Sequence, residues 1–181
     1  MIVIIDYGCG NLLSLKRALD EFKIPNEVSK DKTKILNAKL LILPGVGAFE
    51  NAMNLLKKND LIETILEFTT KRNKPLIGIC LGMQLLLESS EEFGINKGLN
   101  LIKGKVKSLN DLSNAEMITK PTNMGWQKLN KNFDNKLIKN LNSNDEFYHV
   151  HSYFCDIKDN SNVITNGKFN QKIFPNIINK E

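Results

Sequence analysis

The chain has few of the residues that build metal sites or disulfide frameworks. Its 181 residues include three cysteines, Cys9, Cys80 and Cys155, and two histidines, His149 and His151. No CxxC pair occurs, so we expect no metal site and no cofactor. A sparse, odd set of cysteines also argues against a disulfide framework and favours a reduced, cytoplasmic setting.

Long apolar runs and basic stripes are absent as well. The first six residues lack the length and basic start of a signal peptide, and no apolar run approaches membrane length. The formal charge of +5 comes from scattered lysines without interleaved aromatics, which favours a solvated surface over nucleic-acid binding. We therefore expect neither a membrane nor a nucleic acid as a partner.

The first half of the chain alternates short apolar runs with helical patterns. Strands are predicted at 2–5, 27–29, 39–43 and 76–79, and helices at 12–22, 31–37, 48–58, 61–71 and 81–88. The continuous apolar runs are typical of buried parallel strands, and Asp31 is a plausible N-cap. This alternation predicts an α/β fold, with a flavodoxin-like parallel sheet and helices on both faces. Three of the strands end in glycine-bearing loops, where ligands bind in such sheets.

The pattern changes after residue 92. Residues 99–109 end in the alternation of apolar and polar residues typical of antiparallel strands. Residues 124–129 and 146–154 are strand-like, 111–122 and 160–167 are predicted loops, and 169–181 has room for one short strand. We predict an antiparallel extension of the sheet within a single domain spanning 1–181, with no internal repeat or linker.

Cys80 stands at the predicted turn from strand to helix. Gly78 and Gly82 lie two residues on either side, the pattern of a Gly-x-nucleophile-x-Gly elbow. A helix N-terminus favours a thiolate, and its free N–H groups can hold a developing oxyanion. A buried structural cysteine is the alternative, but the two glycines fit it poorly.

Five segments resemble those of the class I, or triad, glutamine amidotransferases. They are DYGCGN at 6–11, PGVG at 44–47, GICLGMQ at 78–84, MGW at 124–126 and VHSY at 150–153. Within that family they are similar to the glutaminase subunits of imidazole glycerol phosphate synthases, from residue 1 to about residue 174. The resemblance implies hydrolysis of L-glutamine to glutamate and ammonia. The ammonia would pass to a (β/α)8-barrel synthase subunit in a heterodimer for histidine biosynthesis.

The resemblance also implies roles for particular residues. Cys80 would attack the side-chain amide and form a glutamyl thioester. The N–H of Leu81 and a reoriented peptide near Val46 would form the oxyanion hole, and Gly45 and Gly47 would give that peptide its freedom.

Further residues are assigned to the substrate and the partner by the same resemblance. Gln84, Ser152 and Tyr153 would bind glutamine, with His151 a structural member of its motif. Asn11, Trp126 and Tyr148 would lie toward the synthase, although ordinary packing accounts for these three equally well. The motifs leave two other functions open: ammonia donation for amidating a bacterial surface sugar, and a catalytically dead binding or regulatory subunit.

The sequence departs from the family in one respect. The family's triad takes a histidine and a glutamate from a Phe-His-Pro-Glu motif that this sequence lacks. We therefore expect the last strand and helix to be missing and glutaminase activity to be weak at best. Substitution of the base by His149 or His151 is disfavoured, because a base must reach the nucleophile. A missing strand should also expose apolar surface and a sheet edge, lowering stability.

Overall fold

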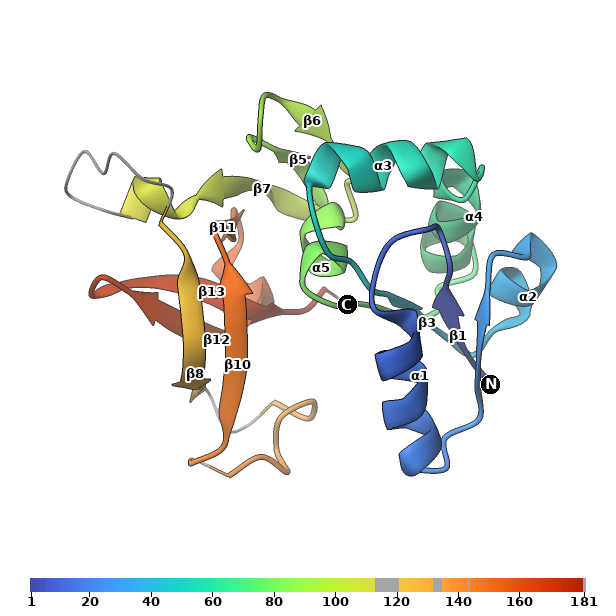
Figure 1. Ribbon diagram of the computed structural model, residues 1–181, viewed down its shortest axis with the longest axis horizontal. Helices are drawn as coiled ribbons and strands as arrows, with labels where there is room; N and C mark the ends of the chain where they lie inside the picture. The colour runs from blue at the N-terminus through green and yellow to red at the C-terminus, as the bar shows by residue number, and fades with distance from the viewer. Residues whose placement is uncertain (113–120, 132–134, 143, 181) are drawn as a thin grey trace. The chain divides into compact units, whose positions relative to one another are not determined.

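The computed structural model describes residues 1–112, 121–131, 135–142 and 144–180 (Figure 1). The chain forms two compact units. Unit 1 comprises Met1–Glu88 and Asn96–Leu101, and unit 2 comprises Ser89–Ile95 and Ile102–Glu181. Most of the loop predicted at 111–122 lies outside the described residues.

Unit 1 contains the predicted parallel sheet. Its strands are β1 (Ile2–Ile5), β2 (Asn26–Ser29), β3 (Leu40–Leu43) and β4 (Leu76–Gly78), in the order β2-β1-β3-β4. Every neighbouring pair is parallel. The middle strands bury β-branched and leucine side chains completely, as a central parallel strand must. The predicted α/β class is confirmed.

The helices of unit 1 follow the predicted pattern closely. They are α1 (Leu12–Glu21), α2 (Lys32–Asn37), α3 (Phe49–Lys58), α4 (Ile62–Leu66), the π-helical turn η1 (Glu67–Lys71) and α5 (Leu81–Leu85). Asp31 is the predicted N-cap of α2, and its side chain accepts a hydrogen bond from the Lys34 N–H at 2.9 Å. The predicted helix at 61–71 is thus an α-helix that continues as a π-helical turn.

Helix α5 is shorter than predicted. It ends at Leu85, and the chain continues as strand β5 (Leu87–Ser90) instead of staying helical to residue 88. The carbonyls of residues 85–88 accept hydrogen bonds from the backbone of 98–101, including Leu99 N–H to Leu85 at 2.8 Å. These long-range bonds, together with the short strand β6 (Asn96–Lys97) beside β5, replace the helical ones.

Two elements of unit 1 are less buried than their apolar patterns suggest. Strand β4 was predicted to be buried, but Ile77 and Ile79 are 46% and 41% exposed. Among the described strands β4 pairs only with β3, so it lies at an edge of the sheet. Helix α1 buries none of its side chains fully, and Phe22 at its C-cap is 77% exposed. An apolar pattern thus predicts that a strand or helix forms, but not how deeply the rest of the chain buries it.

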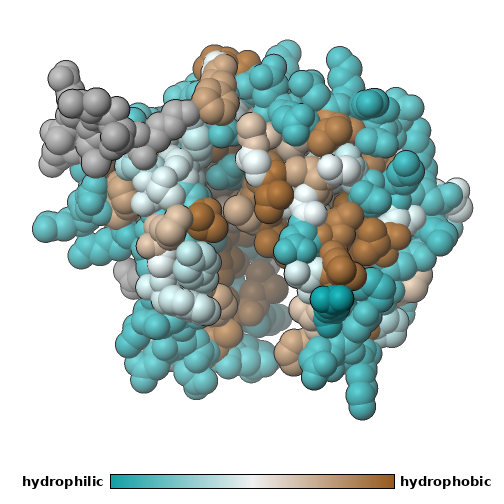
Figure 2. Space-filling view, in the orientation of Figure 1, coloured by the Kyte–Doolittle hydropathy of each residue, from teal (hydrophilic) through white to brown (hydrophobic). Residues whose placement is uncertain are grey.

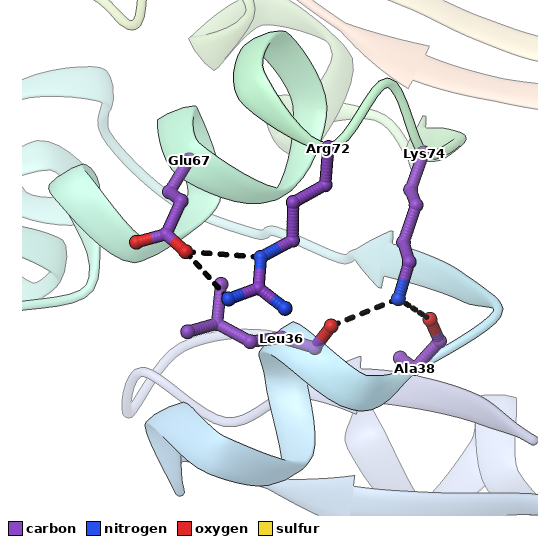
Figure 3. A network of polar contacts seen from close by, with 5 residues as sticks. All are labelled: Leu36, Ala38, Glu67, Arg72 and Lys74. Atoms are coloured by element: carbon purple, nitrogen blue, oxygen red, sulfur yellow. Dashed lines mark hydrogen bonds and ion pairs between the residues drawn. The ribbon is translucent and has the colours of Figure 1, made fainter.

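Lys74 anchors the entry to β4. Its ammonium donates to the carbonyls of Leu36 at 2.9 Å and Ala38 at 2.8 Å, at the C-terminal end of α2 (Figure 3). Arg72, on the same connection, pairs with Glu67 at 2.7 Å. Cations at a helix C-terminus satisfy free carbonyls and oppose the helix dipole. This network therefore fixes the chain just before the strand that carries Cys80.

Unit 2 is built from antiparallel strands, as predicted. Strands β7 (Ile102–Ser108) and β11 (Tyr153–Ile157) pair, and β5, at the division between the units, is the next strand of that sheet. Strands β8 (Asn123–Lys128) and β10 (Glu146–His151) form a separate two-stranded ribbon. Strand β12 (Val163–Phe169) lies between β13 (Lys172–Ile178) and β9 (Asn130–Lys131). Two 3₁₀ turns, η2 (Leu109–Leu112) and η3 (Asn160–Asn162), complete the unit.

Two predictions for unit 2 need correction. The strand-like run 146–154 is two strands in different sheets, separated at Ser152. The loop predicted at 160–167 is confined to η3, and the chain then enters β12. The turn-forming residues of that stretch concealed a strand that buries Ile164, Thr165 and Gly167. The last short strand predicted within 169–181 is present as β13.

Candidate active site

Cys80 occupies a strained elbow at the end of β4. Its φ and ψ are 55° and −115°, outside the regions that side-chain-bearing residues favour. A Cβ on Gly82 would overlap the Leu43 carbonyl oxygen, and one on Gly78 would lie 2.6 Å from the Gly82 carbonyl oxygen. Both glycines are therefore required by close backbone contact. The turn has the geometry of a nucleophile elbow.

The loops that follow β1 and β3 contact each other beside this elbow. A Cβ on Gly45 would lie 2.9 Å from both the Gly82 nitrogen and the Leu81 Cβ. The Tyr7 hydroxyl donates to the Pro44 carbonyl at 2.8 Å. The Cys9 thiol donates to the Val46 carbonyl at 2.8 Å. All three loops lie at the carboxyl ends of parallel strands, where α/β proteins bind ligands.

Three backbone N–H groups near this junction suit an oxyanion. The Leu81 N–H lies at the Cys80 thiol, where it favours the thiolate. In the part of the chain that the structure describes, the N–H groups of Val46 and Gly47 donate to no protein acceptor. Gly47 has φ of +95°, which suits glycine. Gly45, by contrast, is required by its contact with the elbow.

The Cys80 thiol is a weaker acid than its place before a helix suggests. Cys80 is exposed as a residue, but desolvation of its thiol raises the pKa above the ordinary value, and the Leu81 N–H only partly opposes this. The N–H at the start of the helix thus lowers the pKa, as expected, but desolvation outweighs it. Helix α5 is a single short segment, so its dipole is small. A base must take the thiol proton before the sulfur attacks.

Tyr7 and Cys9 contribute to this junction and were not predicted as site residues. Tyr7 is fully buried, and the pKa of its hydroxyl is raised first by burial and then by the charges of Cys9 and Cys80. The sequence offered one signal for both: Tyr7 and Cys9 lie in the glycine-rich segment that directly follows a buried strand.

Two other predicted residues of unit 1 have clear local contacts. Gln84 lies on α5, half-buried, and its backbone N–H donates to the Cys80 carbonyl at 3.3 Å. The side chain of Asn11 accepts a hydrogen bond from the Ser14 N–H at 3.2 Å and thereby caps α1. Asn11 therefore has a structural role at the start of α1.

The predicted substrate residues of unit 2 lie where β10 gives way to β11: Ser152 separates the two strands, and Tyr153 is the first residue of β11. The Ser152 carbonyl accepts a hydrogen bond from the Leu109 N–H at 2.9 Å, and its hydroxyl pairs with Thr122 at 2.9 Å. The Tyr153 carbonyl lies 2.9 Å from His151 Nδ1. Unit 1 and unit 2 are described separately, so the part of Ser152 and Tyr153 in glutamine binding stays a prediction.

His151 is held inside unit 2 by both ring nitrogens. Nδ1 donates to the Tyr153 carbonyl, and Nε2 accepts from the Asn123 side-chain amide at 2.9 Å. Its ring packs edge-on against Phe174. Burial is the main cause that lowers its pKa, so the neutral form is favoured. These contacts suit the structural role predicted for His151.

The ribbon of β8 and β10 exposes large side chains on one face. Trp126 and Tyr148 are cross-strand partners, 67% and 54% exposed, with ring centroids 5.6 Å apart. Met124 and Val150 form the next pair on that face and are also more than half exposed. The surface over this ribbon is largely pale to brown in Figure 2. Unpaired apolar surface of this kind marks an interaction site.

Two kinds of feature are absent from the described residues. No group of three or more His, Cys, Asp and Glu side chains among them is arranged to hold a metal ion. No helix within the same ranges is long and apolar enough to cross a membrane.

The structure is that of an α/β protein with a strained cysteine at a strand-to-helix elbow beside its parallel sheet. The model of the family "Glutamine amidotransferase class-I" matches residues 3–181. The chain belongs to the class-I glutamine amidotransferase family.

Within this family, the chain is similar to curated proteins that share one name. The imidazole glycerol phosphate synthase subunit HisH of Listeria monocytogenes is 43% identical over 92% of this chain and 77% of its own length. The subunit of the same name from Sulfurimonas denitrificans is 44% identical over 89% of this chain and 77% of its own length.

Solved structures agree at the level of the fold. A crystal structure of a glutamine amidotransferase matches 97% of this chain and 82% of its own, with a TM-score of 0.65 and 16% identity. The PurLQS structure from Thermotoga maritima matches 94% of this chain and 76% of its own, with a TM-score of 0.64 and 16% identity.

Proposed function

We propose that this chain is the glutaminase subunit of an imidazole glycerol phosphate synthase, and that it supplies ammonia for histidine biosynthesis. The observation that carries the proposal is the Cys80 elbow, with its obligatory glycines and adjacent N–H groups. The names of the curated relatives favour this pathway over amidation of a surface sugar. The chain would work in the cytoplasm.

The reaction would pass through a covalent intermediate. The Cys80 sulfur attacks the side-chain carbonyl carbon of glutamine, and the carbonyl electron pair moves onto the oxygen. The Leu81 N–H and the loop at 44–47 would stabilise that oxyanion. The C–N bond then breaks, and the NH2 group leaves as ammonia with the proton that the thiol has lost. Water hydrolyses the glutamyl thioester to glutamate and restores the thiol. We assign neither His149 nor His151 as the base.

Substrate and partner contacts are proposed from the same family membership. Gln84, Ser152 and Tyr153 would hold the glutamine. The exposed face of the ribbon, with Trp126 and Tyr148, would contact a (β/α)8 synthase subunit. Aromatic side chains are the residues that most often anchor such interfaces. Asn11 would lie toward the same partner while it caps α1.

The proposal predicts that a glutamine analogue with a diazoketone in place of the side-chain amide will alkylate Cys80. The sulfur would first add to the ketone carbonyl, which forms an oxyanion at the place where glutamine forms one. The thiol proton would pass to the diazo carbon, nitrogen gas would leave, and the sulfur would move to that carbon as the ketone forms again. Peptide mass mapping should find the adduct at Cys80, and excess glutamine should slow its formation. Cys80→Ala should abolish it, whereas Cys155→Ala, which removes a buried thiol of unit 2, should not. Adducts formed equally at all three cysteines, without protection by glutamine, would refute the proposal.

A further inference from the structure

Two side chains of the loop after β1 hold two carbonyls of the loop after β3. Tyr7 binds the Pro44 carbonyl and Cys9 binds the Val46 carbonyl, each at 2.8 Å. The two bonds therefore fix the chain on both sides of Gly45, the residue that contacts the elbow. Cys9 is half-buried, whereas Val46 is 56% exposed.

The bond from Cys9 sets the direction of one peptide plane. The Val46 carbonyl and the Gly47 N–H belong to the same planar peptide and point in opposite directions. With the carbonyl held by a thiol, the Gly47 N–H is directed away from Cys9. The neighbouring Val46 N–H is also left without an acceptor among the described residues. Gly47, with φ of +95° and no atom within 4 Å of where its Cβ would lie, can adopt this arrangement.

The orientation of this peptide matters for an anionic intermediate. A donor aimed at an oxyanion contributes a factor of about 10²–10³ in rate. A carbonyl oxygen in the same place would repel the charge. A contact that occupies the Val46 carbonyl therefore favours the donor arrangement of the loop.

We propose that Cys9 is a positioning residue for the glutaminase reaction: its thiol holds the Val46 carbonyl so that the loop at 44–47 presents N–H groups to the oxyanion formed at Cys80. This inference rests on the proposed function and extends it to a residue outside the catalytic machinery. Cys9 acts through the loop and need not touch the substrate.

The thiol is not needed to bring the two loops together. Tyr7 already joins them through Pro44, and a Cβ on Gly10 would lie only 3.2 Å from the Pro44 ring. Removing the sulfur should therefore release the Val46 peptide without separating the loops. Cys9→Ala should fold, and Cys9→Ser should keep a donor within reach of the same carbonyl.

The test measures alkylation of Cys80 by the diazoketone analogue at a series of concentrations, with melting temperatures as a check on folding. Cys9→Ala should lower the maximal rate about tenfold, the upper range for one lost hydrogen bond. The half-saturating concentration should not change, because ground-state binding is untouched. Cys9→Ser should restore most of the rate. If Cys9→Ala fails to fold, Cys9→Thr and Cys9→Val give the same comparison, since they differ by a hydroxyl at constant shape.

The outcomes separate this inference from the proposed function. Labelling of Cys80 at the same maximal rate in Cys9→Ala as in the unmodified chain overturns only the role of Cys9. A rate in Cys9→Ser as low as that in Cys9→Ala does the same, because the hydroxyl donor would then have no effect. Absence of labelling in the unmodified chain overturns the proposed function and this inference with it.

Discussion

The elbow of unit 1 and the ribbon of unit 2 are specified in opposite ways. Around Cys80 the backbone packs so closely that Gly45, Gly78 and Gly82 have no room for a Cβ. Along β8 and β10, Trp126 and Tyr148 project from the surface, and Gly125 has open space around it. Around the elbow, close backbone packing thus excludes every residue type except glycine at these three positions. On the ribbon, by contrast, exposed side chains can be shortened without disturbing the fold.

The largest expected effect on stability comes from adding one methyl group at the elbow. Gly82→Ala drives a Cβ into the Leu43 carbonyl, so strand and elbow must separate. We expect a loss of about 3 kcal/mol or more in the free energy of unfolding, together with loss of Cys80 labelling. Urea denaturation and mass mapping measure the two effects.

Gly125→Ala is the matched control in the ribbon. Its φ of +140° makes alanine strained, but no atom lies within 4 Å of the added Cβ. Strain alone should cost about 1–2 kcal/mol and leave Cys80 labelling intact. The contrast between the regions fails if both substitutions destabilise the chain equally.

The same contrast explains which parts of the fold could be predicted from sequence. The apolar runs of β1 and β3 and the Asp31 cap are local signals, and they predicted their elements well. The end of α5 and the exposed edge position of β4 depend on distant backbone partners, which no local pattern reports. Ser152 lies within an unbroken strand-like run, so the change of sheet there is invisible in the sequence.

For the candidate site, the glycines around Cys80 were a sufficient signal for the elbow, because close backbone contact restricts the residue type. Tyr7 and Cys9 were missed, because their partners are backbone carbonyls of another loop. Every residue has a backbone carbonyl, so the residue types of the accepting loop do not reveal these hydrogen bonds. The sequence also suggested a stabilised thiolate, since a helix start is visible in it whereas the desolvation of the Cys80 thiol is not.

Removing side chains from the ribbon gives the next effect in size. Trp126→Ala and Tyr148→Ala should each change the free energy of unfolding by no more than about 1 kcal/mol, since both residues are exposed and lose mainly their mutual ring contact. If the ribbon is the proposed contact surface, each should weaken binding to the proposed synthase subunit by about 2 kcal/mol, roughly thirtyfold. Calorimetric titration measures this affinity.

Ile173→Ala provides the control for exposure alone. Ile173 is 62% exposed on β13 of the same unit but does not lie on the ribbon. We expect unchanged affinity for the synthase subunit. Equal losses of affinity in all three variants would show that general surface hydrophobicity, and not this face, drives the association.

The smallest effect compares two titratable groups, Cys80 of unit 1 and His151 of unit 2, whose pKa values are shifted by desolvation. Burial raises the pKa of Cys80 and lowers that of His151, so each group favours its neutral form in the folded protein. Folded Cys80 keeps its proton longer than the unfolded chain does. Its contribution is complete below the unfolded thiol pKa, near 8.5, and is lost as the pH rises. Neutral His151 contributes above the unfolded imidazole pKa, near 6.5, and that contribution is lost as the pH falls.

Unfolding free energies from urea titrations between about pH 5.5 and 9.5 should therefore decline at both ends. Cys80→Ala should reduce the alkaline decline and leave the acid one. His151→Gln should do the reverse, because a neutral amide replaces the imidazole that the acid protonates. An alkaline decline of full size in Cys80→Ala would mean that the elbow thiol is not held in its protonated form by burial.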